Sequence, residues 1–189
     1  MAFKKNLEEF KDALDLYIAG KKYGVDDGQD HSFYTDDDAG STTGKISELT
    51  VLGTFKEGGA DRLRKIAQII GSKYQAIISV GTIHDLRFVI IDNDTRLIFA
   101  STFDGTWDTY INDFATKIPE VLDVIFDCLE GWPGIKDPTV KEYIKSIQHT
   151  SIMWYASHPN LTVTDITRQN KIVAGINKVL DEASLTFER

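Results

Sequence analysis

The sequence has a single cysteine and no apolar segment of membrane-spanning length. Cys128 cannot form an intramolecular disulfide, and it cannot supply a Cys-x-x-Cys pair for zinc or redox chemistry. A membrane-crossing helix needs about 20 mainly apolar residues, whereas Glu8, Glu9 and Asp12 interrupt the first apolar stretch of the chain. The sequence therefore predicts a cytoplasmic protein with no membrane partner and no disulfide.

Basic charge and familiar site motifs are also scarce. The chain has 21 Lys and Arg against 29 Asp and Glu, a formal net charge of -8. An acidic surface repels phosphate backbones, so nucleic acid is not an expected partner. The motifs of dinucleotide, acyl-transfer and zinc sites (Gly-x-Gly-x-x-Gly, Gly-x-Ser-x-Gly and His-Glu-x-x-His) do not occur. The Asp-rich stretch 26–38 lacks the ligand alternation and closing Glu of a calcium loop, so no metal site is expected.

The chain divides into a polar extension and a larger domain. Residues 3–19 place apolar side chains three and four positions apart, which predicts an amphipathic helix. Residues 23–44 are rich in Asp, Gly, Ser and Thr, a composition typical of a surface loop or linker. We therefore interpret residues 1–44 as a helix with an acidic flexible extension, and residues 45–189 as one α+β domain.

Apolar periodicity predicts the elements of this domain. Alternation of apolar and polar residues favours strands, and spacings of three and four favour helices. The expected strands are 49–55, 86–92, 96–103 and 151–158, and the expected helices are 61–77, 107–114, 121–129 and 138–148, with a closing helix capped by Thr162 or Thr164. The order β-α-β-β-α-β plus a helix is that of the ferredoxin-like fold.

One face of such a sheet has no helices against it, and apolar side chains there need cover. Two solutions are open: two copies join their sheets into a dimeric α/β barrel, or the amino-terminal helix acts as a lid. The closing helix is expected to turn an inner stripe toward the core, formed by Ile166, Val173, Ile176 and Leu180. A homodimer is the expected assembly.

The segment from His84 to Phe114 carries the densest group of polar and aromatic residues. It reads H-x-x-R-F-V-I-x-D and then F-A-S-x-F-D-G-x-W-D-x-Y-x-x-D-F. In this segment, and in the later EGWPG and WYASHPNLTVTDI, the chain resembles a group of largely uncharacterised bacterial proteins, over roughly residues 45–182.

The resemblance implies a ferredoxin-like fold of the dimeric α/β-barrel type. Proteins of that type include haem-dependent peroxidases and chlorite-degrading enzymes, cofactor-free monooxygenases and small-molecule binders, and the fold does not choose among them. Haem is therefore a cofactor that the resemblance suggests and the sequence leaves undecided.

His84, Arg87 and Asp104 are the candidate catalytic residues. His84 precedes a strand, where its ring could act as a general base or an iron ligand, or donate a structural hydrogen bond. Arg87 lies within the strand, so it should pair with a carboxylate such as Asp104 or bind an anionic group of a ligand. Asp104 would orient Arg87, or cap the helix that follows.

Asp108, Tyr110, Trp107 and Tyr155 are the candidate ligand-binding residues. Asp108 lies in the first turn of a helix, where a carboxylate complements the helix dipole. With Tyr110 it could line the polar wall of a pocket, or belong to a strand-to-helix corner held by caps. Trp107 and Tyr155 could stack on a flat ligand or pack in the core.

Two functions remain open. The first is a small-molecule-binding protein or enzyme of the α/β-barrel type, oxidative or haem-linked in its enzymatic form, with a pocket between sheet and helices. The second is a non-catalytic dimerisation or protein-interaction module that uses the open face of the sheet.

Overall fold

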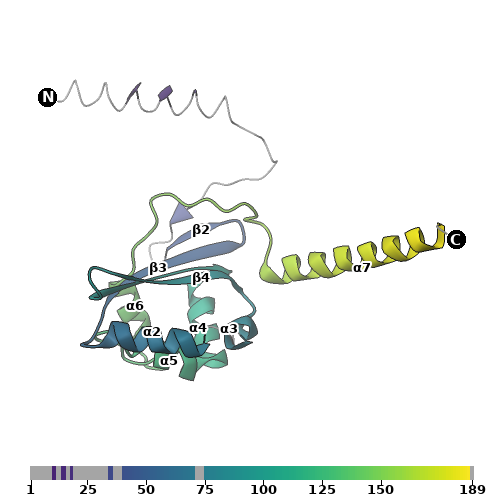
Figure 1. Cartoon of the computed structure of the whole chain (residues 1–189). Helices are drawn as coiled ribbons and strands as arrows, with labels where there is room; N and C mark the ends of the chain where they lie inside the picture. The colour runs from purple at the N-terminus through teal and green to yellow at the C-terminus, as the bar shows by residue number, and fades with distance from the viewer. Residues whose placement is uncertain are drawn as a thin grey trace. The chain divides into compact units, whose positions relative to one another are not determined.

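Three long antiparallel strands form the centre of a computed structural model of the chain (Figure 1). They are β3 (Ile46–Thr54), β4 (Ile83–Ile91) and β5 (Arg96–Asp104). Two short strands, β1 (Tyr34–Thr35) and β2 (Ser41–Thr43), extend the sheet, and the strand order is β1-β2-β3-β5-β4. The structure describes residues 10–11, 14–15, 18, 34–35, 40–70 and 75–187, and the side chains of these except at 34–35 and 182–187.

β4 and β5 form the hairpin that the sequence predicts, with Phe88 opposite Phe99. The connecting residues Asp92, Asn93 and Asp94 have φ angles of 52°, 52° and 67°. Asn and Asp adopt this left-handed conformation more readily than other residues with side chains, so the turn follows directly from the sequence.

Helices cover one face of the sheet. They are α2 (Gly59–Ile70), α3 (Gln75–Val80), α4 (Trp107–Lys117), α5 (Pro119–Phe126) and α6 (Val140–Ser146), all on the same side in Figure 1. Their apolar stripes pack on the inward side chains of the strands, and the α+β class predicted from the sequence is confirmed. The helix predicted over 61–77 is two helices, and residues 71–74 between them lie outside the described residues.

The prediction of a strand over residues 151–158 is wrong. This segment is irregular, and Ile152 is 99% exposed. The reason is that the edge of β3 is already occupied along its length. β2 pairs with the beginning of β3, and farther along the Leu52 N–H donates to the Ile147 carbonyl while the His149 N–H donates to the Thr50 carbonyl, each at 2.8 Å.

The polar stretch that the sequence analysis assigned to a linker contributes β1 and β2 to the sheet. β1 has two residues and β2 contains only Ser and Thr, so neither shows the apolar alternation that periodicity detects. The chain forms two units, residues 1–30 and 31–189, which are described separately. The helix predicted over 3–19 lies largely outside the described residues, although the described positions 10–11, 14–15 and 18 are helical.

The closing helix is α7 (Val163–Phe187). Of the two predicted caps, Thr162 and Thr164, the helix uses Thr162. The Thr162 hydroxyl accepts from the Asp165 N–H at 3.0 Å, while the Asp165 carboxylate accepts from the Thr162 N–H at 3.1 Å. This reciprocal pair is a capping box. The predicted inner stripe is wrong, since Val173, Ile176 and Leu180 are all more than half exposed. Within the described residues, no helix combines the length and apolar character needed to cross a bilayer.

The face of the sheet opposite α2–α6 is mixed rather than apolar. Arg87 on β4 lies beside Ala100 on β5, which lies beside Thr50 on β3. The neighbouring row holds Asp85 and Thr102. Polar side chains in these rows reduce the need for the cover that the sequence analysis expected.

Substitution of Gly59 tests how tightly α2 packs on the core. A Cβ at this position would lie 2.5 Å from the Cys128 carbonyl oxygen and 3.1 Å from the Phe55 ring. Overpacking of this kind costs about 1–3 kcal/mol, so we expect Gly59→Ala to lower the urea midpoint of unfolding. Lys65→Ala, at an exposed position on the same helix, is the control and should change the midpoint little. Equal midpoints for the two variants would contradict the packing.

Candidate functional site

A β-bulge at the start of β4 changes the direction of the His84 side chain. The register of β4 on β5 shifts between Ile83 and Asp85, which leaves His84 as the extra residue. Bulges turn one side chain out of the regular alternation. The His84 Nε2 atom lies 2.7 Å from Asp104 Oδ1, and the two side chains are only 17% and 12% exposed.

Asp104 joins three parts of the fold. It is the last residue of β5, its carboxylate contacts His84, and it accepts from the Val163 N–H with its two oxygens at 3.0 and 3.3 Å. Val163 is the first residue of α7, where N–H groups lack partners within the helix and an anion is stabilised. The cap of α4 is Thr106, which accepts from the Thr109 N–H, so Asp104 serves α7 instead.

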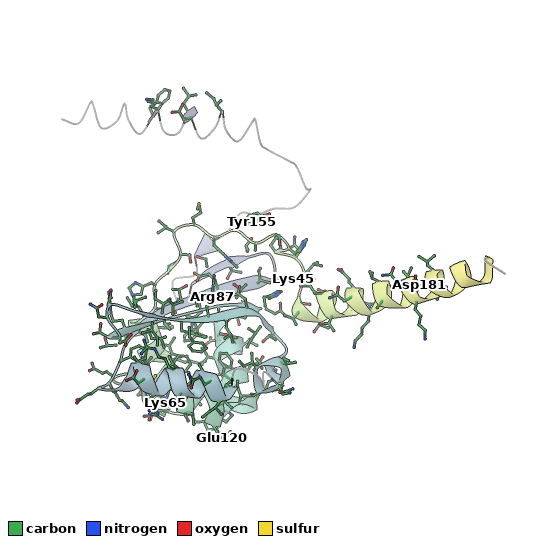
Figure 2. The ribbon with its side chains drawn as sticks, in the orientation of Figure 1. Lys45, Lys65, Arg87, Glu120, Tyr155 and Asp181 are labelled. Carbon is green, nitrogen blue, oxygen red and sulfur yellow. The ribbon has the colours of Figure 1, made fainter. Side chains whose placement is uncertain are left out.

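Arg87 does not pair with Asp104, contrary to one expectation. Arg87 is opposite Ala100, four positions before Asp104 on β5, and four strand residues span about 13 Å. The Arg87 side chain is 67% exposed, with its Nε atom 3.5 Å from Asp85 Oδ1. Figure 2 shows it on the side of the sheet away from Lys65 of α2, where it could meet an anion only at the surface.

Tyr110 and Trp107 lie in the core. The Tyr110 ring stacks on Phe103 with centroids 3.8 Å apart, and its hydroxyl lies 2.6 Å from the Ser101 hydroxyl. Burial raises the pKa of Tyr110 far above its ordinary value, so the phenol stays protonated. Trp107 is buried beneath the ammonium group of Lys145, which lies 5.4 Å from the ring centroid.

Asp108 and Tyr155 are at the surface. The Asp108 carboxylate accepts a 2.6 Å hydrogen bond from Lys141 of α6, and this bond holds the pKa of Asp108 below its ordinary value. Tyr155 is 70% exposed in the segment between α6 and α7. The structure therefore brings His84 and Asp104 together. It gives Arg87, Tyr110 and Tyr155 separate surroundings, whereas Trp107 and Asp108 both lie against Lys141.

Glu48 is a buried carboxylate that the sequence analysis missed. It is 4% exposed, and its oxygens accept from the Ser41 N–H at 3.3 Å, the Ser151 N–H at 3.2 Å and the Thr50 hydroxyl at 3.0 Å. Two of these bonds connect β3 to β2, through Ser41, and to the segment that follows α6, through Ser151. The signal in the sequence is an acidic residue inside an apolar strand, ISELTVLG.

An apolar cavity of about 290 Å³ lies between α2 and the sheet. The inward side chains of β4 contribute to it, alternating with Asp85 and Arg87 on the other face. Its described lining consists of Leu63, Ile66, Ala67, Ile70, Ile77, Leu86, Phe88 and Ile125. None of the seven residues that the sequence analysis selected belongs to this lining. Periodicity could assign these apolar residues to a buried face, but not to a space left between faces.

Haem, which the resemblance suggests, does not fit the described lining of the cavity. The His84 ring directs its Nε2 atom to the Asp104 carboxylate. The described lining of the cavity contains no histidine, cysteine or tyrosine that could bind iron.

Removal of the Asp104 carboxylate should destabilise the domain. Charge-assisted hydrogen bonds contribute about 1.5–3 kcal/mol, and Asp104→Ala leaves both His84 and the Val163 N–H without this acceptor. We expect the melting temperature to fall by several degrees. Asp104→Asn should give an intermediate loss, because the amide oxygen can still accept from Val163.

The control for this prediction is Asp85→Ala. The Asp85 side chain is half exposed and its contact with Arg87 is long, so its removal should change the melting temperature little. An unchanged melting temperature for Asp104→Ala would contradict the structural role of Asp104 and would favour a role in ligand binding.

Comparison with known proteins does not assign the chain to a family. The resemblance in the segment from His84 to Phe114 therefore remains a hypothesis, and any functional conclusion depends on the site itself. No protein-family description, curated protein or solved structure matches the chain.

Proposed function

We propose that the protein binds a small apolar molecule in the cavity between α2 and the sheet. The observation that carries the proposal is the cavity itself, about 290 Å³ with eight apolar residues in its described lining. The cavity opens to solvent at Ala67, and of its eight lining residues only Leu63 and Ile125 are fully buried. The other apolar side chains keep accessible surface, and an apolar ligand would remove that surface from water.

The size of the cavity limits the ligand. An apolar cavity of about 150 Å³ stays dry and accepts benzene, so this one has room for about a dozen carbon-sized atoms. Ligand sites usually begin near 300 Å³. A bicyclic aromatic compound or a short aliphatic chain fits these limits.

The chemistry of the lining favours binding over catalysis. A catalytic pocket needs polar groups within hydrogen-bond reach of the reacting atoms. Among the described residues the lining offers only aliphatic and aromatic side chains. His84 and Asp104 are not in this lining, and they are engaged with each other and with α7.

The strand arrangement supports a ferredoxin-like fold as part of the proposal. β3 and β4 flank β5, and the chain passes from β3 to β4 through α2 and α3. This is a split βαβ unit. Residues 147–149 contact β3 where the last strand of such a sheet would lie.

Naphthalene is a suitable probe of the cavity. We expect it to bind the full-length protein with one site in isothermal titration calorimetry, because its ten carbon atoms match the available space. Ala67→Phe should weaken binding at least tenfold, because Ala67 lines the cavity from α2 and a phenyl ring there would occupy the space.

The matched control is Gln68→Phe. It introduces the same ring at the next position of α2, which is exposed like Ala67 but does not line the cavity. Native mass spectrometry of the purified protein would report any ligand that it retains. Equal affinities of the two variants for naphthalene, or no binding by the unmodified protein, would overturn the proposal.

The second candidate function is a protein-interaction module. It is favoured by one specific observation, the exposed apolar side chains of α7. These lie on a different element from the cavity, so the two functions do not exclude each other.

A further inference from the structure

α7 presents an apolar stripe that the described residues of its own unit, 31–189, leave exposed. Five residues of the helix are between 51% and 65% exposed: Ile172, Val173, Ile176, Val179 and Leu180. At 3.6 residues per turn their side chains fall within an arc of about 120°. Surface helices normally turn an arc of this width toward a core.

The composition of α7 makes an unpaired helix unfavourable. Eight β-branched residues lie between Val163 and Asp181, and Gly175 interrupts the helix interior. β-branched residues and glycine lower helix propensity. Most helical stability in proteins comes from packing of the apolar face, so a helix of this sequence needs a partner along its stripe.

We propose that the partner of α7 is α7 of a second copy of this chain. The apolar residues follow the heptad spacing of helices that pair along a narrow seam. Ile166, Val173 and Leu180 are seven residues apart, and Ile176 lies three residues after Val173. The helix of 25 residues is about 37 Å long, enough for three heptads.

The charge pattern is compatible with pairing between identical helices. In paired helices the positions that flank the seam decide whether two copies attract or repel. Between Ile166 and Leu180 those positions hold Asn170, Ile172, Asn177 and Val179, and all four are uncharged. Asp165, which flanks the seam just before Ile166, is already paired with Lys45 of its own chain. Lys171, Lys178 and Asp181 project from the opposite side of the helix. Two copies can therefore pair without like charges meeting beside the seam. A partner recognised by its charge would instead require charged residues at these positions.

Gln169 gives this seam one polar position, between Ile166 and Val173. A single polar residue in an apolar seam fixes the register of the paired helices, because a shifted pairing would bury the amide against apolar side chains. Arg168 borders the stripe, where its charge can stay in water.

Sedimentation equilibrium of the full-length protein tests the proposal. We expect an oligomer that dissociates on dilution, and we expect Ile176→Glu and, separately, Val173→Glu to raise the dissociation constant at least 100-fold. Each variant would place an unpaired carboxylate in the seam of every copy. The matched control is Lys171→Glu, which introduces the same side chain on the polar side of α7 and should change the constant less than threefold.

Two further measurements separate pairing from misfolding. Because the Ile176 side chain is exposed within the unit of residues 31–189, Ile176→Glu should leave the urea midpoint of the sheet domain and its naphthalene affinity unchanged. Dilution below the dissociation constant should lower the helical circular dichroism of the unmodified protein. A protein that is monomeric at every concentration, or an oligomer that Ile176→Glu leaves intact, would overturn the proposal.

Discussion

β5 is the strand on which the rest of the structure depends, because it pairs with β3 on one side and β4 on the other along its whole length. Its inward side chains Leu97, Phe99 and Phe103 are almost completely buried and receive the helices. Its last residue, Asp104, contacts the His84 ring and accepts a hydrogen bond from the Val163 N–H in the first turn of α7. A change at this strand would therefore act on the core, on the bulge and on the closing helix together.

Local patterns predicted the elements well. The hairpin of β4 and β5, the cap at Thr162 and the α+β class all follow from alternation, turn residues and capping preferences. Residues near in sequence decide these features. The strand expected over 151–158 failed because a competing segment, β2, fills part of the β3 edge, and periodicity contains no information about competition for an edge.

The candidate site was less predictable, since its contacts join distant residues. Asp104 was a reasonable candidate by type, but its hydrogen-bond partners are the Val163 N–H, 59 positions later, and the His84 ring, which lies at a bulge. Tyr110 and Trp107 are polar-tipped aromatic residues that suit either a pocket or a core, and packing on Phe103 and Lys145 decided for the core. The cavity is a property of how α2 meets β4, and no single segment encodes it.

The apolar stripe of α7 is a second feature whose contacts could not be predicted from the sequence. The apolar face of α7 was predicted from the sequence. Amphipathicity indicates that such a face will be covered, but it does not indicate which surface covers it. The first turn of α7 is joined to the sheet through Asp104 and through Lys45, which lies 3.5 Å from Asp165, whereas the stripe begins farther along the helix. An apolar surface supported in this way can pair with another molecule without moving the cavity between α2 and β4. Binding of a small molecule and self-association would then be independent properties of one chain, because they use different helices and share no described residue.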